Sequence, residues 1–234
     1  MGISVQGGRA LKKRVRELLR RPDFDSALEE LCRMRGQQVV NPLFSFLHDG
    51  DEKVKWAAVT AMGAVVAQLA DQDMEAARVI MRRLMWNLND ESGGIGWGSP
   101  EAMGEILSRH KRLANEYAHI LISYTKQDGN YLEHGLLQRG LLWGIGRLAG
   151  VRPELFKNDV HHLIPYMNSV DATVRGLAAR ILGFLRAEEA RSGLEQLSSD
   201  ESEVSMMDSG QLVHCRVKDL AEEALKRLCS DPSR

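Results

Sequence analysis

Two stretches of the chain, DEKVKWAAVTAMGAV at residues 51–65 and DATVRGLAARILGFL at residues 171–185, repeat one pattern. Aligned on their first residues, Asp51 and Asp171, both have a valine three positions on and a cation directly after it. Both then place an alanine at position seven and a glycine at position twelve after the Asp. Apolar residues at this spacing predict a helix, and an Asp directly before a helix is a typical N-cap.

Another apolar segment precedes each of these helices. NPLFSFLHDG begins at Asn41 and HHLIPYMNSV begins at His161, and each contains a proline. The repeated unit is therefore predicted to be a helix, a turn and a second helix. Small alanine and glycine side chains in the second helix let neighbouring helices approach closely.

The same frame fits three further segments more loosely. The glycine position of the pattern is occupied in turn by Gly63, Gly104, Gly146, Gly183 and finally Lys226. Successive markers are 41, 42, 37 and 43 residues apart. In the second copy Ile95 takes the valine position. A near-constant period of this size is typical of stacked helical repeats.

With these features the chain resembles the HEAT-repeat family, including its PBS-lyase HEAT-like subtype, over residues 38–230. The resemblance implies an all-α, armadillo-type fold, a right-handed α-solenoid of about five to six helix pairs. We expect one domain over residues 1–234, with an N-terminal capping helix pair in 1–37, the repeats in 38–230 and a tail at 231–234.

Charge and cysteine content restrict the function classes. The net charge is -1, which argues against a dedicated nucleic-acid binder, because such proteins usually carry a basic excess. The three cysteines, Cys32, Cys215 and Cys229, form no CxxC pair, so we expect a reducing, cytoplasmic location. No signal peptide or long apolar run is seen, and no membrane contact is expected.

Two segments break the repeat. The first, Asn89 to Leu107, is glycine-rich and contains Trp97, which either plugs a gap between helices or binds a partner. The second, Ser198 to Cys215, reads as a mobile loop because of its Ser, Asp and Gly content. The alternative for this second segment is a docking loop that uses its Met206-Met207 pair.

Known HEAT-like enzymes suggest two catalytic alternatives. The di-iron hydroxylases use repeated His-Glu pairs, and here only the reversed Glu133-His134 occurs, so neither a metal nor a cofactor is expected. HEAT-like DNA glycosylases that act on alkylated bases use a Trp and an Asp four residues later. Trp97 and Glu101 have that spacing, but the family's doubled aromatic is replaced by glycines, and a Glu at this place also suits the helix dipole.

We therefore expect a non-catalytic protein-protein interaction or scaffold module that binds a protein or peptide on its concave face. Nucleic acid is the less favoured partner, and the glycosylase is the alternative function. The candidate binding residues are Trp97, Glu101, Glu105, His134, Gln138 and Trp143.

Structural roles are expected for the other conspicuous residues of the repeats. Trp56, Trp86 and Trp143 lie at helical spacing and are predicted to pack in the core. Three cations recur at one repeat position and are predicted to pair with acidic turn residues of adjacent repeats: Lys55, Arg175 and Lys218.

Overall fold

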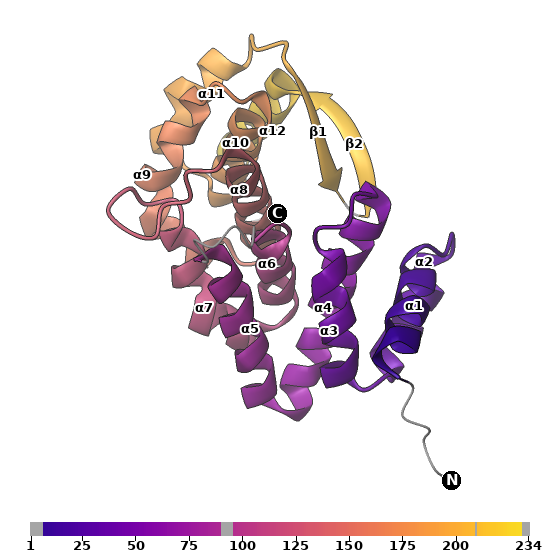
Figure 1. Ribbon diagram of the computed structural model, residues 1–234. Helices are drawn as coiled ribbons and strands as arrows, with labels where there is room; N and C mark the ends of the chain where they lie inside the picture. The colour runs from indigo at the N-terminus through magenta and orange to yellow at the C-terminus, as the bar shows by residue number, and fades with distance from the viewer. Residues whose placement is uncertain (1–6, 90–95, 209, 231–234) are drawn as a thin grey trace. The chain divides into compact units, whose positions relative to one another are not determined.

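The computed structural model of the chain divides into two compact units, residues 1–110 and 111–234 (Figure 1). It describes residues 7–89, 96–208 and 210–230. The predicted tail at 231–234 and Ile95 lie outside the described residues. The single domain expected from the sequence stays a prediction, and each unit is treated by itself below.

Unit 1 is built from three consecutive helix pairs. The helices are α1 (Gly8–Leu19), α2 (Phe24–Arg33), α3 (Gly36–Phe46), α4 (Glu52–Gln72), α5 (Met74–Leu88) and α6 (Ser99–Arg109). The second helices of the pairs form a layer in which α4 packs against both α2 and α6. The N-terminal capping pair predicted from the sequence corresponds to α1 and α2.

Unit 2 repeats the arrangement and adds a β-hairpin. Its elements are α7 (Lys111–Ser123), α8 (Gly135–Ala149), the short helices η1 (Pro153–Leu155), η2 (Lys157–Asp159), α9 (Val160–Leu163) and η3 (Ile164–Asn168), then α10 (Ala172–Leu185), η4 (Glu188–Ala190), α11 (Arg191–Leu197), β1 (Glu203–Asp208), β2 (Gln211–Arg216) and α12 (Val217–Cys229). Helix α10 packs against α8 on one side and α12 on the other.

The predicted N-caps are confirmed. The carboxylate of Asp51 accepts a hydrogen bond from the backbone N–H of Lys53 at 3.1 Å, directly before α4. The carboxylate of Asp171 accepts from Thr173 at 2.9 Å and from Val174 at 3.3 Å, directly before α10. Both caps satisfy N–H groups that the first turn of a helix leaves without an intrahelical partner.

The glycine markers lie where second helices of successive pairs touch. A Cβ on Gly63 would collide with the side chain of Glu105 in α6. A Cβ on Gly183 would lie 2.7 Å from both the Cα and the Cβ of Ala224 in α12. The two residues with the strongest repeat signal thus occupy equivalent environments, in different units, at the seam between one repeat and the next.

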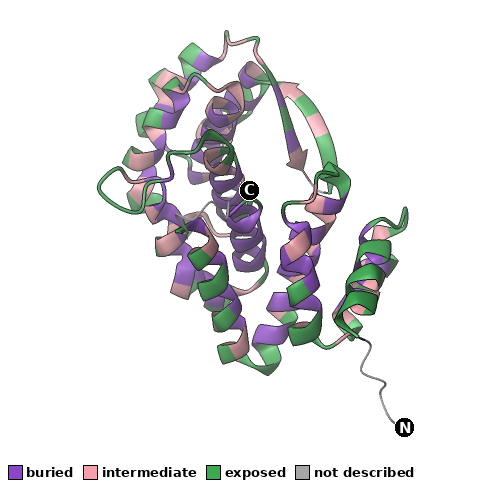
Figure 2. Ribbon diagram, in the orientation of Figure 1, coloured by how far each residue is buried: buried purple, intermediate pink, exposed green. Residues whose placement is uncertain are grey.

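The core lies between the two helix layers of each unit, and the second helices carry much of it (Figure 2). The buried residues of α10 include Val174, Leu177, Ala178, Ile181 and Leu182. Helix α1, in contrast, buries only Val15, Leu18 and Leu19 and exposes most of its other residues. In both helices the buried positions recur at a spacing of three or four residues, as in amphipathic helices.

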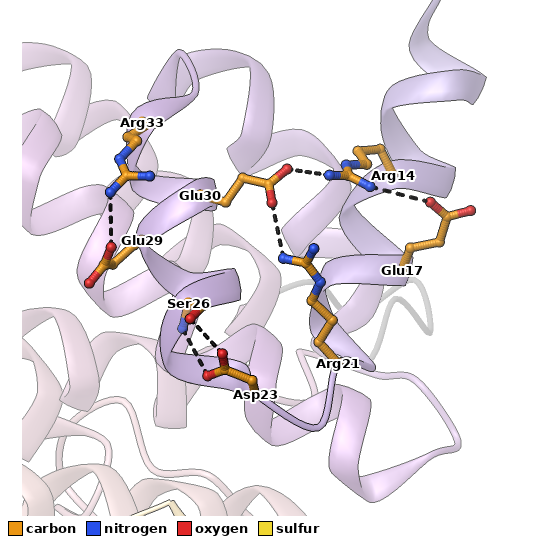
Figure 3. Close-up of polar contacts among 8 residues, drawn as sticks. All are labelled: Arg14, Glu17, Arg21, Asp23, Ser26, Glu29, Glu30 and Arg33. Carbon is orange, nitrogen blue, oxygen red and sulfur yellow. Dashed lines mark hydrogen bonds and ion pairs between the residues drawn. The ribbon is translucent and has the colours of Figure 1, made fainter.

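Charged side chains join helices α1 and α2 (Figure 3). Glu30 of α2 accepts from Arg14 and, at 3.1 Å, from Arg21, which joins α2 to the end of α1. Asp23 caps α2 by accepting from the backbone N–H of Ser26 at 3.2 Å. The high charge density of this segment therefore forms ion pairs that join α1 to α2, and the capping role stays a prediction.

The segment predicted as a mobile loop is largely a β-hairpin, so that interpretation was wrong. Strands β1 and β2 pair antiparallel from Glu203 opposite Arg216 to Asp208 opposite Gln211. Along β1 the residues alternate, with Val204 and Met206 buried against the helices. The Ser and Asp content suggested a loop, whereas this period-two alternation is the signal of a strand.

Candidate functional site

The candidate residue Trp97 is partly exposed, with 38% of its surface accessible. Both flanking glycines pack closely against the backbone of other segments. A Cβ on Gly96 would lie 2.7 Å from the carbonyl oxygen of Asn87, and a Cβ on Gly98 would collide with the carbonyl oxygen of Leu47. Gly98 also has a φ of +77°, a left-handed conformation that favours glycine. The glycines thus anchor the loop and leave Trp97 at the surface instead of fully buried as a plug.

The candidate carboxylates Glu101 and Glu105 are buried, at 4% and 3% accessibility. The Nζ of Lys55 lies 3.3 Å from Oε1 of Glu101. The Nε of Arg109 donates to Oε1 of Glu105 at 2.7 Å. Buried charges are normally paired in this way, because an unpaired one is costly. Glu101 is an ion-pair partner within unit 1 and does not share the exposure of Trp97, which weighs against the glycosylase alternative.

The three candidates in unit 2 all belong to the start or the middle of α8. His134 is exposed and caps the helix, since its Nδ1 accepts from the backbone N–H of Leu136 at 3.3 Å. The amide Nε2 of Gln138 donates to the hydroxyl of Tyr131 at 3.0 Å. The indole N–H of Trp143 donates to the backbone carbonyl of Met207 in β1 at 2.7 Å.

A cleft of about 570 Å³ opens beside the start of α8, and Gln138 is one of its lining residues. We call it the Tyr131 cleft. Its lining includes Thr125, Tyr131, Gln138, His161, His162 and Tyr166. The volume lies in the range of roughly 300–1,000 Å³ usual for ligand pockets. Only Gln138 of the six predicted residues reaches this cleft, because the connection between α7 and α8 and the α9–η3 segment supply most of the lining.

The polar groups of the Tyr131 cleft are arranged by local contacts. The hydroxyl of Tyr166 donates to the carbonyl of Thr125 at 3.2 Å, and the rings of His161 and His162 lie 3.8 Å apart. Burial, followed by the neighbouring Tyr131, raises the pKa of Tyr166. Burial and then the adjacent His161 lower the pKa of His162. These two pKa shifts keep Tyr166 and His162 uncharged near neutral pH, and the carboxyl group of Asp128 also lines the cleft.

All three recurring cations form ion pairs, but only Arg175 pairs with a turn acid of the next helix pair, as predicted, since the partner of Lys55 lies in a helix and that of Lys218 in its own helix pair. Lys55 pairs with Glu101 of the next helix pair, as described above. The guanidinium of Arg175 donates to the carboxylate of Asp200 at 2.8 Å, and Lys218 pairs with Glu201 at 2.5 Å. Each of these ion pairs joins the second helix of a pair, namely α4, α10 or α12, to a carboxylate in a turn or in the first turn of another helix. They therefore stabilise the fold.

The three tryptophans predicted to pack in the core differ in exposure. Trp86 is 73% exposed on α5, so its predicted core position was wrong, whereas Trp56 and Trp143 are half-buried. The helical period alone could not separate the buried from the exposed face at Trp86.

No group of three or more potential metal ligands occurs among the residues that were placed in the structure. No helix in the described ranges is both long and apolar enough to span a membrane.

Comparisons with known proteins identify the fold. No family model matches the chain. An uncharacterized protein of Archaeoglobus fulgidus is 25% identical over 186 residues, which is 77% of this chain and 92% of that protein.

Solved structures with a similar fold include two designed armadillo repeat proteins. One is 19% identical, with a TM-score of 0.51, and the alignment covers 93% of this chain and 99% of the other. The second was solved in complex with the peptide (KR)4; it is 18% identical, with a TM-score of 0.52 and the same two coverages. An engineered protein at 18% identity reaches a TM-score of 0.53, covering 94% of this chain and 99% of that one. The chain therefore has the all-α repeat fold of the α-solenoid class, as the sequence predicts.

Proposed function

We propose that this protein is a non-catalytic interaction module that binds a segment of a protein partner. The observation that carries the proposal is the Tyr131 cleft, a cleft of ligand size beside the start of helix α8. Its hydrogen-bonding side chains and aromatic rings suit a peptide, whose backbone amides need hydrogen bonds and whose side chains need apolar contact. No arrangement of nucleophile, base and orienting group is needed for such a role.

The fold supports a peptide as the class of ligand. Helical repeats present side chains at regular intervals, which suits the recognition of extended chains. One of the designed armadillo proteins with this fold carries a bound peptide, (KR)4. A cytoplasmic location remains part of the proposal and is supported by the three cysteines, which are all free thiols.

The six candidate residues are divided between the two units, and only those of unit 2 can be related to the Tyr131 cleft. Gln138 lines the Tyr131 cleft, and His134 is exposed one helical turn earlier. Trp97 offers exposed aromatic surface in unit 1. The indole N–H of Trp143 is bonded to the hairpin, and Glu101 and Glu105 are ion-paired, so we propose that each of them shapes the surface of its own unit and does not contact the partner directly.

A displayed library of random linear peptides, selected on the full-length chain, tests the proposal. Selected peptides should bind the Tyr131→Ala variant at least tenfold more weakly, a loss of about 1.4 kcal/mol, because the variant removes an exposed ring and the acceptor of Gln138. Trp86→Ala is the matched control, since it removes a more exposed aromatic from unit 1. A selection in which no peptide distinguishes Tyr131→Ala from Trp86→Ala, or one without binders, would overturn the proposal.

A further inference from the structure

One carboxylate of the Tyr131 cleft has no partner within the chain. Asp128 is exposed in the connection between α7 and α8, and it lines the cleft. Its side chain forms no hydrogen bond or ion pair with any residue that the structure describes. The turn that carries it is closed by a hydrogen bond from the backbone N–H of Gly129 to the carbonyl of Lys126 at 3.0 Å. The carboxylate is therefore held at the cleft and keeps its full capacity to accept hydrogen bonds.

The charges around Asp128 leave the cleft negative. Neither a lysine nor an arginine occurs among its described lining residues. Lys126, next to the lining in sequence, is already paired with Asp159, with 2.8 Å between Nζ and Oδ1. The lowered pKa of His162 keeps that imidazole uncharged near neutral pH. With the histidines counted as neutral, Asp128 is the single unbalanced charge of the described lining, so the cleft favours a cation.

The other groups of the lining indicate which cation fits. Gln127 and Asn168 present exposed amide groups that form no side-chain hydrogen bond within the described ranges. Tyr131 and Tyr166 add aromatic rings, and the hydroxyl of Tyr131 accepts from the amide of Gln138 at 3.0 Å. A guanidinium group is planar, stacks on aromatic rings and carries more N–H donors than an ammonium group. It therefore matches several acceptors beside aromatic surface better than a lysine does.

We propose that the Tyr131 cleft binds an arginine side chain of the partner segment, with the carboxylate of Asp128 accepting from its guanidinium. The proposal rests on the peptide-binding function proposed above and names the side chain that this site selects. Hydrogen bonds between charged groups are roughly twice as strong as neutral ones, so this contact distinguishes arginine from uncharged residues. An acidic segment is a poorer occupant, because its carboxylates would meet Asp128 without a lysine or arginine in the described lining to offset the repulsion.

The experiment compares Asp128→Asn with Glu133→Gln in the full-length chain. Each variant removes one exposed carboxylate from the connection between α7 and α8, but Glu133 does not line the cleft. Both changes conserve the size of the side chain, and Asp128 has no bond within the described residues whose loss would unfold the protein. The probe is the same displayed library of random linear peptides. Selected peptides are then synthesised with arginine, lysine or citrulline, which is the neutral isostere of arginine.

We expect the peptides that are weakened by Tyr131→Ala to be enriched in arginine. Asp128→Asn should weaken their binding about fivefold, whereas Glu133→Gln should change it less than about twofold. Citrulline in place of the arginine should weaken binding to the wild type by a similar factor. It should weaken binding to Asp128→Asn much less, because both changes remove the same charged contact. Lysine should bind more weakly than arginine, since it lacks the planar group.

The assignment of arginine fails separately from the proposed function. Peptides that are sensitive to Tyr131→Ala but lack arginine, or that bind Asp128→Asn as tightly as the wild type, would refute the assignment and leave the peptide-binding role in place. Free arginine that competes at the same concentration as the peptide would also refute it, because the ligand is then a small molecule. If no peptide is sensitive to Tyr131→Ala, the proposed function is wrong and the assignment falls with it.

Discussion

At the scale of single residues, the repeat depends on places where a side chain cannot fit. Gly63 and Gly183 are such places, because the next inner helix passes directly over them. A larger residue has to push that helix away or adopt a strained rotamer, and overpacking of this kind usually costs about 1–3 kcal/mol. The same glycine position in two units therefore has the same physical role.

Gly183→Leu should lower the free energy of unfolding by about 1–3 kcal/mol, since the backbone of Ala224 lies only 2.7 Å from the Cβ position. Urea unfolding followed by circular dichroism measures the change. Gly135→Ala is the control, because nothing lies within 4 Å of its Cβ position. Equal stability of the Gly183 variant and wild type would show that the assigned repeat register is wrong.

At the scale of elements, the hairpin depends on the contact between Asp200 and α10. Burial would raise the pKa of Asp200, but hydrogen bonds from Ser202 and Arg175 outweigh it and hold that pKa below its ordinary value. A lowered pKa in the folded state means that the contact stabilises the protein above the unfolded pKa of about 3.9. The stabilisation is lost as the pH falls through the lower, folded value.

Asp200→Asn should therefore destabilise the protein at neutral pH, and the difference from wild type should shrink below about pH 4. Urea midpoints measured across the acidic range test this prediction. Asp25→Asn, an exposed change in the first turn of α2, controls for the loss of one charge. A difference that stays constant with pH would mean that the carboxylate charge is not what stabilises the turn before β1.

At the scale of the whole molecule, repeats are coupled to their neighbours, so a chain of pairs can unfold as one body. We predict a single cooperative unfolding transition for residues 1–234, with calorimetric and van't Hoff enthalpies that agree. Gly63→Leu in unit 1 and Gly183→Leu in unit 2 should each shift that one transition. Two transitions, each shifted by only one of the variants, would instead assign the units 1–110 and 111–234 to separate domains.

The candidate site was only partly predictable from the sequence. Gln138 was identified because it lies on an inner helix, and it lines the Tyr131 cleft. Tyr131, His161 and Tyr166 were missed as site residues because the candidates were taken from second helices, whereas these residues come from a connection and from the first part of a repeat. Trp86 shows the opposite error, since helical spacing gives a face but not which face is outward.

The sequence by itself determined the helix pairs, their caps and their period, because these depend on local hydrogen bonding and on the spacing of apolar residues along one chain segment. Only the tertiary structure decided that Glu101 is ion-paired with Lys55 and that strands β1 and β2 pair with each other. These features depend on which distant segments meet, and one-dimensional spacing carries no information about such contacts.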